Sequence, residues 1–259
     1  MVNVNKEFTN FKIHTQYSIC EGAIKIDDLS NYCKRNKVKS IGLCDSFNLC
    51  GALEFADKIS KTGTQPIIGT HINFSIEGVI GKLPLFATSA LGYKNLIKLS
   101  SKSYLESDGK SDPHCEINDL INFNQDVIIL SGNHFDLFGN LFKSNKIKVL
   151  EKTVNEIKST FNQRFYFEIQ RHNELGERDF ENFLMNISLK NTIPLIASQE
   201  VYYLNHDMYE AHDALVCIGE KDFVDNTKRK KYSNQHYLKD HKELIKLFSD
   251  IPEALENNY

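Results

Sequence analysis

The sequence predicts an α/β fold, a distorted (β/α) barrel of about seven strands, for the 259 residues of this chain. Short apolar runs alternate with amphipathic segments of helical periodicity over almost the whole length. The connections between them are short, and none is rich in Pro, Gly or Ser. Strands that alternate with helices imply a parallel sheet, and about six or seven such units in one domain indicate a barrel.

The predicted strands are short apolar runs with the length of buried or half-buried strands. In the first of them, Phe11 and Ile13 alternate with polar residues, which is typical of a strand with one buried face. Pro84 in the fourth run indicates an edge strand or an irregular start, because proline has no N–H for the ladder. The predicted strands are 10–14, 39–43, 66–71, 83–87, 126–130, 165–169 and 193–197.

Between the strands, apolar residues recur at intervals of three and four positions, which predicts amphipathic helices. In the second of these helices, Leu53, Ala56 and Ile59 would share the buried face. Residues 106–113 and 227–231 are predicted loops, and the second of them is basic. The predicted helices are 26–35, 50–61, 92–104, 138–142, 147–161, 177–189, 207–217, 241–248 and 252–257.

Composition argues for an ordinary globular protein. Hydrophobic residues make up 41% and charged residues 25% of the chain, and a net charge of −3 provides no basic field that would attract nucleic acid non-specifically. The six cysteines form no C-x-x-C pair, so neither a disulfide framework nor a zinc ribbon is expected. Residues 1–6 are polar, and no apolar run approaches membrane-spanning length. These features predict a soluble cytoplasmic protein without membrane contact.

Polar and ionisable residues directly follow the predicted strands, at the end of a barrel where active sites are built. A hydrolytic metal centre needs several imidazole and carboxylate ligands for each divalent ion. The residues that follow the strands include such groups, but they also include the ammonium of Lys12, which repels cations and only donates hydrogen bonds. The residues at these strand ends are Lys12, His14, Asp45, Ser46, His71, Asn133, His134, Gln170, Arg171, His172, Gln199 and Glu200.

Five runs of sequence, in order along the chain, match motifs of one protein family. They read F-T-N-F-K-I-H-T-Q-Y-S-I-C-E-G at 8–22, C-D-S-F-N-L-C-G-A-L-E-F at 44–55, Q-P-I-I-G-T-H at 65–71, G-Y-K-N-L-I-K-L-S-S at 92–101 and L-F-S-D-I-P-E-A-L-E-N at 247–257. The chain resembles the N-terminal polymerase-and-histidinol-phosphatase (PHP) domain of bacterial DNA polymerase III α subunits. Motifs of that family include F-x-H-L-H-x-H-S-x-Y-S-L-L-D-G and T-D-H-G-N-L-x-G-A-x-E-F. The resemblance extends over nearly the whole chain and is strongest for the proteobacterial branch.

The resemblance implies a metal site at which this chain departs from the metal-binding members. Lys12, Ser46 and Tyr202 stand where those members have histidines. The vestigial metal-site positions are Lys12, His14, Glu21, Asp45, Ser46, His71, Lys82, Asn133, Glu200 and Tyr202. The ligand types that persist, His14, Glu21, His71 and Glu200, are too few for the family's cluster of metal ions.

We therefore expect no catalytic residue and no bound metal in this chain, with His14, His71 and Glu200 as the weak candidates for a metal ligand set. Lys12 is expected to pair with Glu21 or Glu200, so that a salt bridge replaces a metal ion at the barrel mouth.

The resemblance also implies a function for a longer parent protein. The family's α subunits are DNA-directed DNA polymerases, which extend a primer with Mg²⁺ ions held by palm carboxylates downstream of this stretch. Residues 1–259 would be a single PHP domain cut from such a subunit, without its palm, thumb and fingers. The implied role is an inactive scaffold with no cofactor, which stabilises the polymerase and docks the proofreading ε exonuclease. DNA would be contacted through the parent protein.

Two other functions remain open at this stage. An active PHP phosphoesterase or 3′–5′ exonuclease would bind about three metal ions, whereas a decayed site would bind none or one. A free-standing binding protein unrelated to replication is disfavoured by the uncapped helical pattern at the C-terminus. Several conspicuous residues also have plain structural explanations: His14 as a hydrogen-bonded histidine, Cys44 as a packing residue, Asp213 as a structural carboxylate and 228–231 as a solvated loop.

Overall fold

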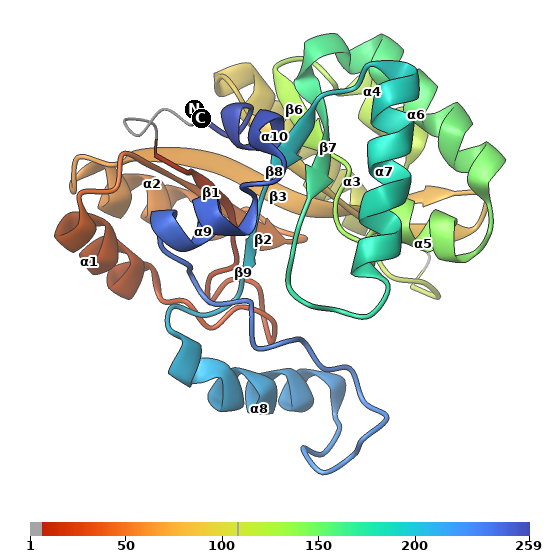
Figure 1. Cartoon of the computed structure of the whole chain (residues 1–259). Coiled ribbons are helices and arrows are strands. Elements are labelled where there is room, and N and C mark those ends of the chain that lie inside the picture. Colours follow the sequence, from red (N-terminus) through yellow and green to blue (C-terminus); the bar gives the residue numbers. More distant parts are fainter. Residues whose placement is uncertain (1–6, 108) are drawn as a thin grey trace.

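A computed structural model describes residues 7–107 and 109–259 of the chain. In this part of the chain, nine strands form one sheet that curls into an incomplete barrel (Figure 1). The strand order is β8-β7-β6-β4-β3-β2-β1-β9, and β5 pairs with β3. The predicted α/β class and distorted barrel are confirmed. The strands are β1 (Asn10–Ile13), β2 (Ser40–Ser46), β3 (Gln65–Ile76), β4 (Val79–Ala87), β5 (Cys115–Glu116), β6 (Val127–Leu130), β7 (Phe165–Ile169), β8 (Leu195–Ala197) and β9 (Glu200–Val201).

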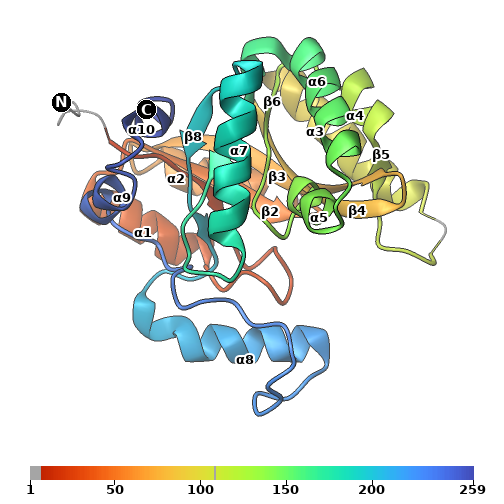
Figure 2. The same cartoon turned by 45° about the vertical axis from the view of Figure 1, so that its right-hand side comes forward.

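The helices lie around the outside of the curled sheet, except α8, which stands apart from the barrel (Figure 2). Each predicted helix is present, and α6 has the predicted bounds. The short helix α4 was not predicted. The helices are α1 (Ile26–Asn36), α2 (Ala52–Ser60), α3 (Ala90–Leu105), α4 (Ile117–Asn122), α5 (Leu137–Lys143), α6 (Ile147–Phe161), α7 (Glu177–Asn191), α8 (Tyr209–Glu220), α9 (His241–Leu247) and α10 (Pro252–Glu256), with 3₁₀ turns η1 (Asn162–Arg164) and η2 (His206–Met208).

The two ends of the sheet are consecutive in the chain. β8 pairs with β7 at one end, and β9 pairs with β1 at the other. Two residues separate β8 from β9. Since an extended residue spans at most about 3.6 Å, Ala197 and Glu200 lie within about 11 Å of each other. The chain itself therefore brings the edges of the sheet together.

A side-chain amide bonds across the remaining gap between β1 and β8. Asn258, which is only 3% exposed, follows α10. Its Oδ1 accepts a hydrogen bond from Thr9 N at 2.7 Å, and its Nδ2 donates to Thr9 O at 3.0 Å and to Ala197 O at 2.9 Å. These are the backbone groups that a neighbouring strand would otherwise satisfy. The amide of Asn258 therefore takes the place of ladder hydrogen bonds at the seam.

The sheet departs from a purely parallel barrel at β4, which is antiparallel to both β3 and β6. The two-residue turn Glu77–Gly78 has positive φ at both positions, +48° and +79°, which is typical of a tight hairpin. The prediction that Pro84 marks an edge strand is wrong, because β4 lies between β3 and β6. β6 pairs with β4 only over 85–87, so Pro84 lies just outside that ladder.

The hydrophobic core fills the space between the sheet and the surrounding helices. A second cluster packs α1 and α2 against β1 and β2. It includes Ile26 and Leu29 of α1 and the predicted face residue Ile59 of α2. The prediction that Leu53 shares this face is wrong, since its side chain is 81% exposed. The helix buries Phe55 instead, four positions before Ile59.

None of the described helices is both long enough and apolar enough to cross a membrane. The polar segment predicted at residues 1–6 lies outside the described residues, as does residue 108 of the predicted loop.

Replacing Asn258 with alanine should lower the free energy of unfolding by about 2–4 kcal/mol, because the change leaves buried backbone groups of Thr9 and Ala197 without partners. Urea denaturation measures the effect. Asn36→Ala, at an exposed asparagine of α1, is the matched control and should stay within about 0.5 kcal/mol of the wild type. Equal losses for the two variants would contradict the role of the seam.

Candidate functional site

The mouth of the barrel gathers residues from distant parts of the chain. It is formed by the carboxyl ends of the parallel strands and by the beginning of β4, whose reversed direction puts Lys82 opposite Asn73 at the same end. A cavity of about 640 Å³ opens there, and its lining includes Glu21, Lys82 and Glu200. The fold therefore brings most of the predicted strand-end residues together.

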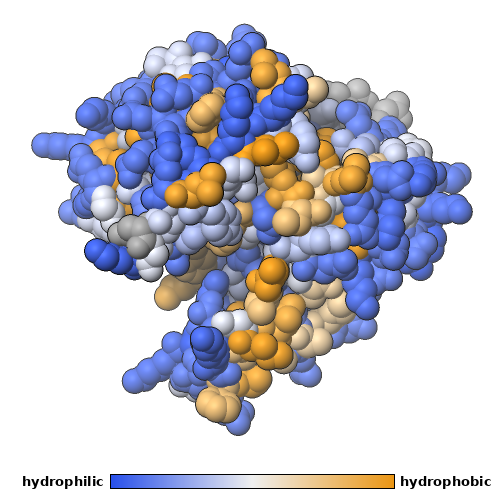
Figure 3. All heavy atoms as spheres, turned by 180° about the vertical axis from the view of Figure 1, so that it is seen from behind, coloured by the Kyte–Doolittle hydropathy of each residue, from blue (hydrophilic) through white to orange (hydrophobic). Residues whose placement is uncertain are grey.

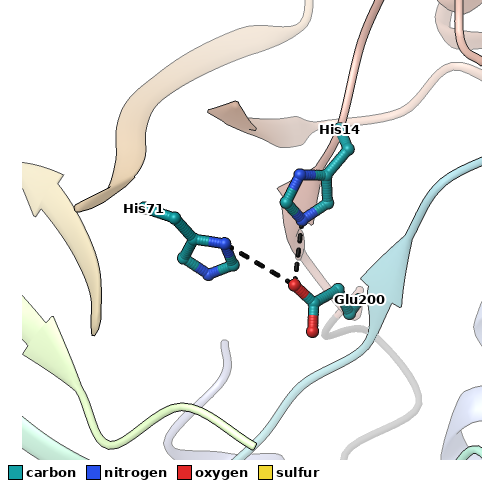
Figure 4. Close-up of side chains that lie close together, drawn as sticks. All are labelled: His14, His71 and Glu200. Atoms are coloured by element: carbon teal, nitrogen blue, oxygen red, sulfur yellow. Dashed lines mark hydrogen bonds and ion pairs between the residues drawn. The ribbon is translucent and has the colours of Figure 1, made fainter. Parts of the chain in front are cut away.

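Glu200 on β9 is the centre of the buried part of this site. His14 Nε2 lies 3.0 Å and His71 Nδ1 3.6 Å from Glu200 Oε1 (Figure 4). Asn133 Nδ2 donates to Glu200 Oε2 at 2.6 Å. Burial alone would raise the pKa of Glu200, but the charge of Lys12 and the hydrogen bond from His14 hold it well below its ordinary value. Glu200 is therefore an ionised carboxylate inside the protein.

The ammonium of Lys12 lies 3.1 Å from Glu168 Oε1 and 3.5 Å from Glu200 Oε2, with no exposure of Lys12 or Glu168. Burial lowers the pKa of Lys12, yet Glu168 and then Glu200 raise it above its ordinary value. Of the two predicted partners, Glu200 is one and Glu21 is not. Glu168 was not predicted, although it is the one charged residue in the apolar strand Phe165–Ile169. This charged residue within an apolar strand was the sequence signal that could have identified Glu168.

Glu21 pairs with the second lysine of the mouth. Lys82 Nζ lies 2.7 Å from Glu21 Oε1 and donates to Ser46 Oγ at 3.1 Å, while Ser46 Oγ donates to Glu21 Oε2. Burial favours a higher pKa for Glu21, but Lys82 holds it well below the ordinary value. A second internal ammonium therefore neutralises this carboxylate.

Phe47 covers Lys82 from the side of β2. The ammonium lies 5.0 Å from the centroid of the Phe47 ring, a cation–π distance. Phe47 has φ +67°, a conformation that is strained for a bulky residue, and it stands where the motif T-D-H-G-N has glycine. Its N–H donates to His71 O at 2.8 Å, which fixes the backbone in this conformation.

Two of the predicted positions serve other purposes. Asp45 accepts hydrogen bonds from Thr15 N, Thr15 Oγ1 and Ser18 Oγ at 2.6–2.7 Å, so it fixes the turn after β1. Burial raises the pKa of Asp45, an effect that these hydrogen bonds oppose. The ring of Tyr202 lies 4.5 Å from that of His14, and burial raises the pKa of its hydroxyl well above the ordinary value.

Two other strand-end residues, Arg171 and Gln199, have their partners elsewhere. Arg171 pairs with Glu181 and Asp250 at 2.8 and 2.6 Å. Gln199 donates to backbone carbonyls of the loop before α9. Cys44 is buried in an apolar cluster, as expected of a packing residue.

The basic loop is more than a solvated segment. Arg229 is nearly buried and forms a bidentate pair with Asp213 on α8, at 2.5 and 2.7 Å. The structural explanation given for Asp213 therefore holds, whereas the expectation of a solvated loop fails at Arg229.

His14, His71 and Glu200 could hold a metal ion, because one ligand atom from each lies within 4.8 Å of the others. Both ring nitrogens of His71 are buried without a hydrogen-bond partner, which suits a ligand. Against this, Lys12 already neutralises Glu200, and Lys82 neutralises Glu21. The donor set therefore suits at most one ion and does not fit a cluster of metal ions.

A model of the PHP domain matches residues 10–172 of the chain. This chain belongs to the PHP domain family. The matched stretch runs from β1 beyond the end of β7, so it includes both internal lysines, Lys12 and Lys82, and ends before Glu200.

Curated relatives of this PHP domain carry one common name. DNA polymerase III subunit alpha of Caulobacter vibrioides is 34% identical over 260 residues, which is 96% of this chain and 23% of the relative. The subunit alpha of Rickettsia bellii is 35% identical over 252 residues, which is 97% of this chain and 22% of the relative. The chain thus spans less than a quarter of the length of these relatives.

Among solved structures, an amidohydrolase from Chromobacterium violaceum, with bound sulfate and no metal, matches with a TM-score of 0.50. The match covers 80% of this chain and 96% of that chain at 8% sequence identity. At this identity the likeness concerns the fold alone.

Replacing Lys12 with methionine should lower the free energy of unfolding by about 3–5 kcal/mol, since Glu168 and Glu200 would remain buried without a counter-charge. Urea denaturation near neutral pH measures the loss. The matched control is Lys61→Met, which breaks an exposed pair with Asp57 and should cost less than about 1 kcal/mol. If both variants lose the same stability, Lys12 does not have this role.

Asp136, buried beside the same cluster, gives a pH-dependent prediction. Burial, and then the charge of Glu200, raise the pKa of Asp136 to about 7. The unfolded carboxyl titrates near pH ~4, so the stability associated with Asp136 is complete below about pH 4 and is lost as the pH rises to about 7.

The free energy of unfolding of Asp136→Asn, relative to the wild type, should therefore increase between about pH 4 and 8, by up to about 4 kcal/mol. Denaturation of both proteins across this range tests the prediction, and a difference that does not change with pH would contradict it.

Proposed function

We propose that this chain is the PHP domain of a DNA polymerase III subunit alpha and that the domain is not itself catalytic. The observation that carries the second statement is the position of Lys12. Its ammonium is buried between Glu168 and Glu200, where the resemblance implies a metal-binding histidine. The first statement is supported by the names of the curated relatives and by the length of this chain over which they match it.

An internal ammonium opposes metal catalysis at this mouth for electrostatic reasons. A divalent cation bound to Glu200 would lie close to the charge of Lys12, and repulsion between like charges at short range is strong inside a protein. Hydrolysis of phosphoesters by such sites depends on metal ions that activate water and stabilise the leaving group. A site in which lysines neutralise the carboxylates lacks these functions.

In this proposal the domain acts as a scaffold within the longer subunit. The remainder of the subunit would carry the polymerase palm, with its carboxylates and Mg²⁺, and would contact the DNA. The barrel would support that part and would dock the proofreading ε exonuclease. The seam bonded by Asn258 and the two ion-paired lysines of the mouth suit this role.

A second function is favoured by one observation. His14, His71 and Glu200 form a compact donor set, and neither nitrogen of the His71 ring has a hydrogen-bond partner among the described residues. One metal ion there would provide a Lewis acid for a phosphoesterase or 3′–5′ exonuclease. In that case His14 and His71 would act as neutral imidazole ligands and Glu200 as the carboxylate ligand.

Incubation of the purified chain with single-stranded DNA and Mn²⁺ or Zn²⁺ separates the two functions. We expect no release of nucleotides above that of a His14→Ala control, and about one metal ion per chain at most. Metal-dependent release that is abolished by His14→Ala would overturn the scaffold proposal in favour of the phosphoesterase.

A further inference from the structure

Residues 206–237 form a separate lobe beside the barrel mouth, which we call the lid (Figures 1 and 2). The lid consists of η2, α8 and the loop that returns to the barrel. Its two ends lie side by side, because Tyr203 and Tyr237 form a parallel bridge and Leu238 N donates to Tyr203 O at 3.0 Å. A segment whose ends meet in this way is able to turn about them as a hinge.

The cavity of the mouth has walls from both the barrel and the lid. The barrel contributes residues such as Ile19 and Phe47, and the lid contributes Val216, Gly219 and Tyr232. Glu200 lies in the same cavity. The position of the lid therefore determines how open the cavity is.

Two interactions join α8 to the returning loop, so the lid moves as one body. Asp213 and Arg229 form their bidentate ion pair with side chains only 9% and 3% exposed. Tyr209 Oη on α8 donates to Tyr232 O on the loop at 3.2 Å. A nearly buried bidentate pair restricts the loop far more than an exposed pair would. Tyr232 is thereby carried on a body that includes α8.

On its inner side the lid makes polar contacts with Glu21 of the barrel. Tyr232 Oη donates to Glu21 Oε1 at 3.1 Å. His212 Nε2 lies 2.8 Å from Glu21 O, and the ring nitrogen must be the donor because a carbonyl only accepts. Gly219 approaches the neighbouring Cys20 so closely that a Cβ there would lie 2.5 Å from Cys20 Cβ. These contacts come from both parts of the lid and meet on adjacent barrel residues.

The barrel holds Glu21 in place for these contacts. Lys82 from β4 and Ser46 from β2 both bond its carboxylate, and the strained Phe47 covers Lys82. The other carboxylate that the lid contacts is Glu174, which accepts from Ser233 N at 3.3 Å and from His236 Nε2 at 3.1 Å. Both of these donors lie close to the hinge in sequence.

The lid has few buried apolar side chains. Val216 and Cys217 of α8 are buried, whereas Ile218 is 71% and Phe223 81% exposed, and Ile19 on the barrel is 83% exposed. Figure 3 shows hydrophobic surface on both the barrel and the smaller lobe, on the face opposite to that of Figure 1. The polar contacts with Glu21 therefore act together with this small apolar contact in attaching the lid.

We propose that Glu21 is a latch that holds the lid closed over the barrel mouth and that the lid opens as a unit about its hinge at Tyr203 and Tyr237. The latch uses a carboxylate whose family position implies a metal ligand. A metal-binding position has thus become the attachment point of a movable cover. This inference does not depend on the polymerase assignment.

Hydrogen exchange of the 259-residue chain, measured by mass spectrometry without metal or DNA, tests the latch. Tyr232→Phe removes the hydroxyl that bonds Glu21 and leaves the mouth of the barrel intact. We expect amides within 209–237 to exchange about tenfold faster in this variant, while those of β3, β6 and β7 keep the wild-type rate.

Glu21→Ala is the second variant and should accelerate exchange in the lid at least as much as Tyr232→Phe. The matched control is Glu210→Gln, at an exposed carboxylate on α8, which should leave exchange unchanged. Wild-type exchange in the lid of both test variants would overturn the latch. An equal increase in the exchange rate over the lid and the barrel would also overturn the latch, because it would indicate a general loss of stability.

Discussion

The buried ammonium of Lys12 is the constraint on which the barrel mouth depends. It lies between carboxylates from β7 and β9, while Lys12 itself belongs to β1. β1 and β7 are separated by four strands in the sheet, so the Lys12–Glu168 pair acts across the barrel, whereas Glu200 is the neighbour of Lys12 in the β1–β9 ladder. A charge without solvent exposure is tolerated only with such partners. The ion pairs of Lys12 therefore depend on the curl of the sheet, and they in turn stabilise the curled sheet.

The same principle recurs at the second lysine, with a different result. Lys82 reaches Glu21 from β4, and Glu21 in turn contacts the lid. In both places an ammonium from the chain itself lies against a carboxylate of the mouth. At Lys82, the hydroxyl of Ser46 and the ring of Phe47 complete the surroundings of the ammonium.

The periodicity of apolar residues predicted helices and strands well where a single period, helical or strand-like, determined the local sequence. The bounds of α6 and β7 follow from it directly, and motif order identified the family. The pattern failed where tertiary context decided, as in the β3–β4 hairpin, which depends on Glu77 accepting a positive φ. The sequence indicated that His14, His71 and Glu200 would meet, because strand ends converge. It did not identify Glu168, whose role depends on which strands oppose each other across the barrel.

The asparagine at the seam has a consequence for the order of synthesis. Asn258 bonds Thr9 across 249 positions of sequence and Ala197 across 61. A growing polypeptide on the ribosome therefore carries an unsealed sheet until α10 and Asn258 have emerged. During that interval the rims of β1 and β8 are exposed to pairing with neighbouring chains. Chaperone protection of the nascent polypeptide would matter most in this window, before Asn258 leaves the exit tunnel.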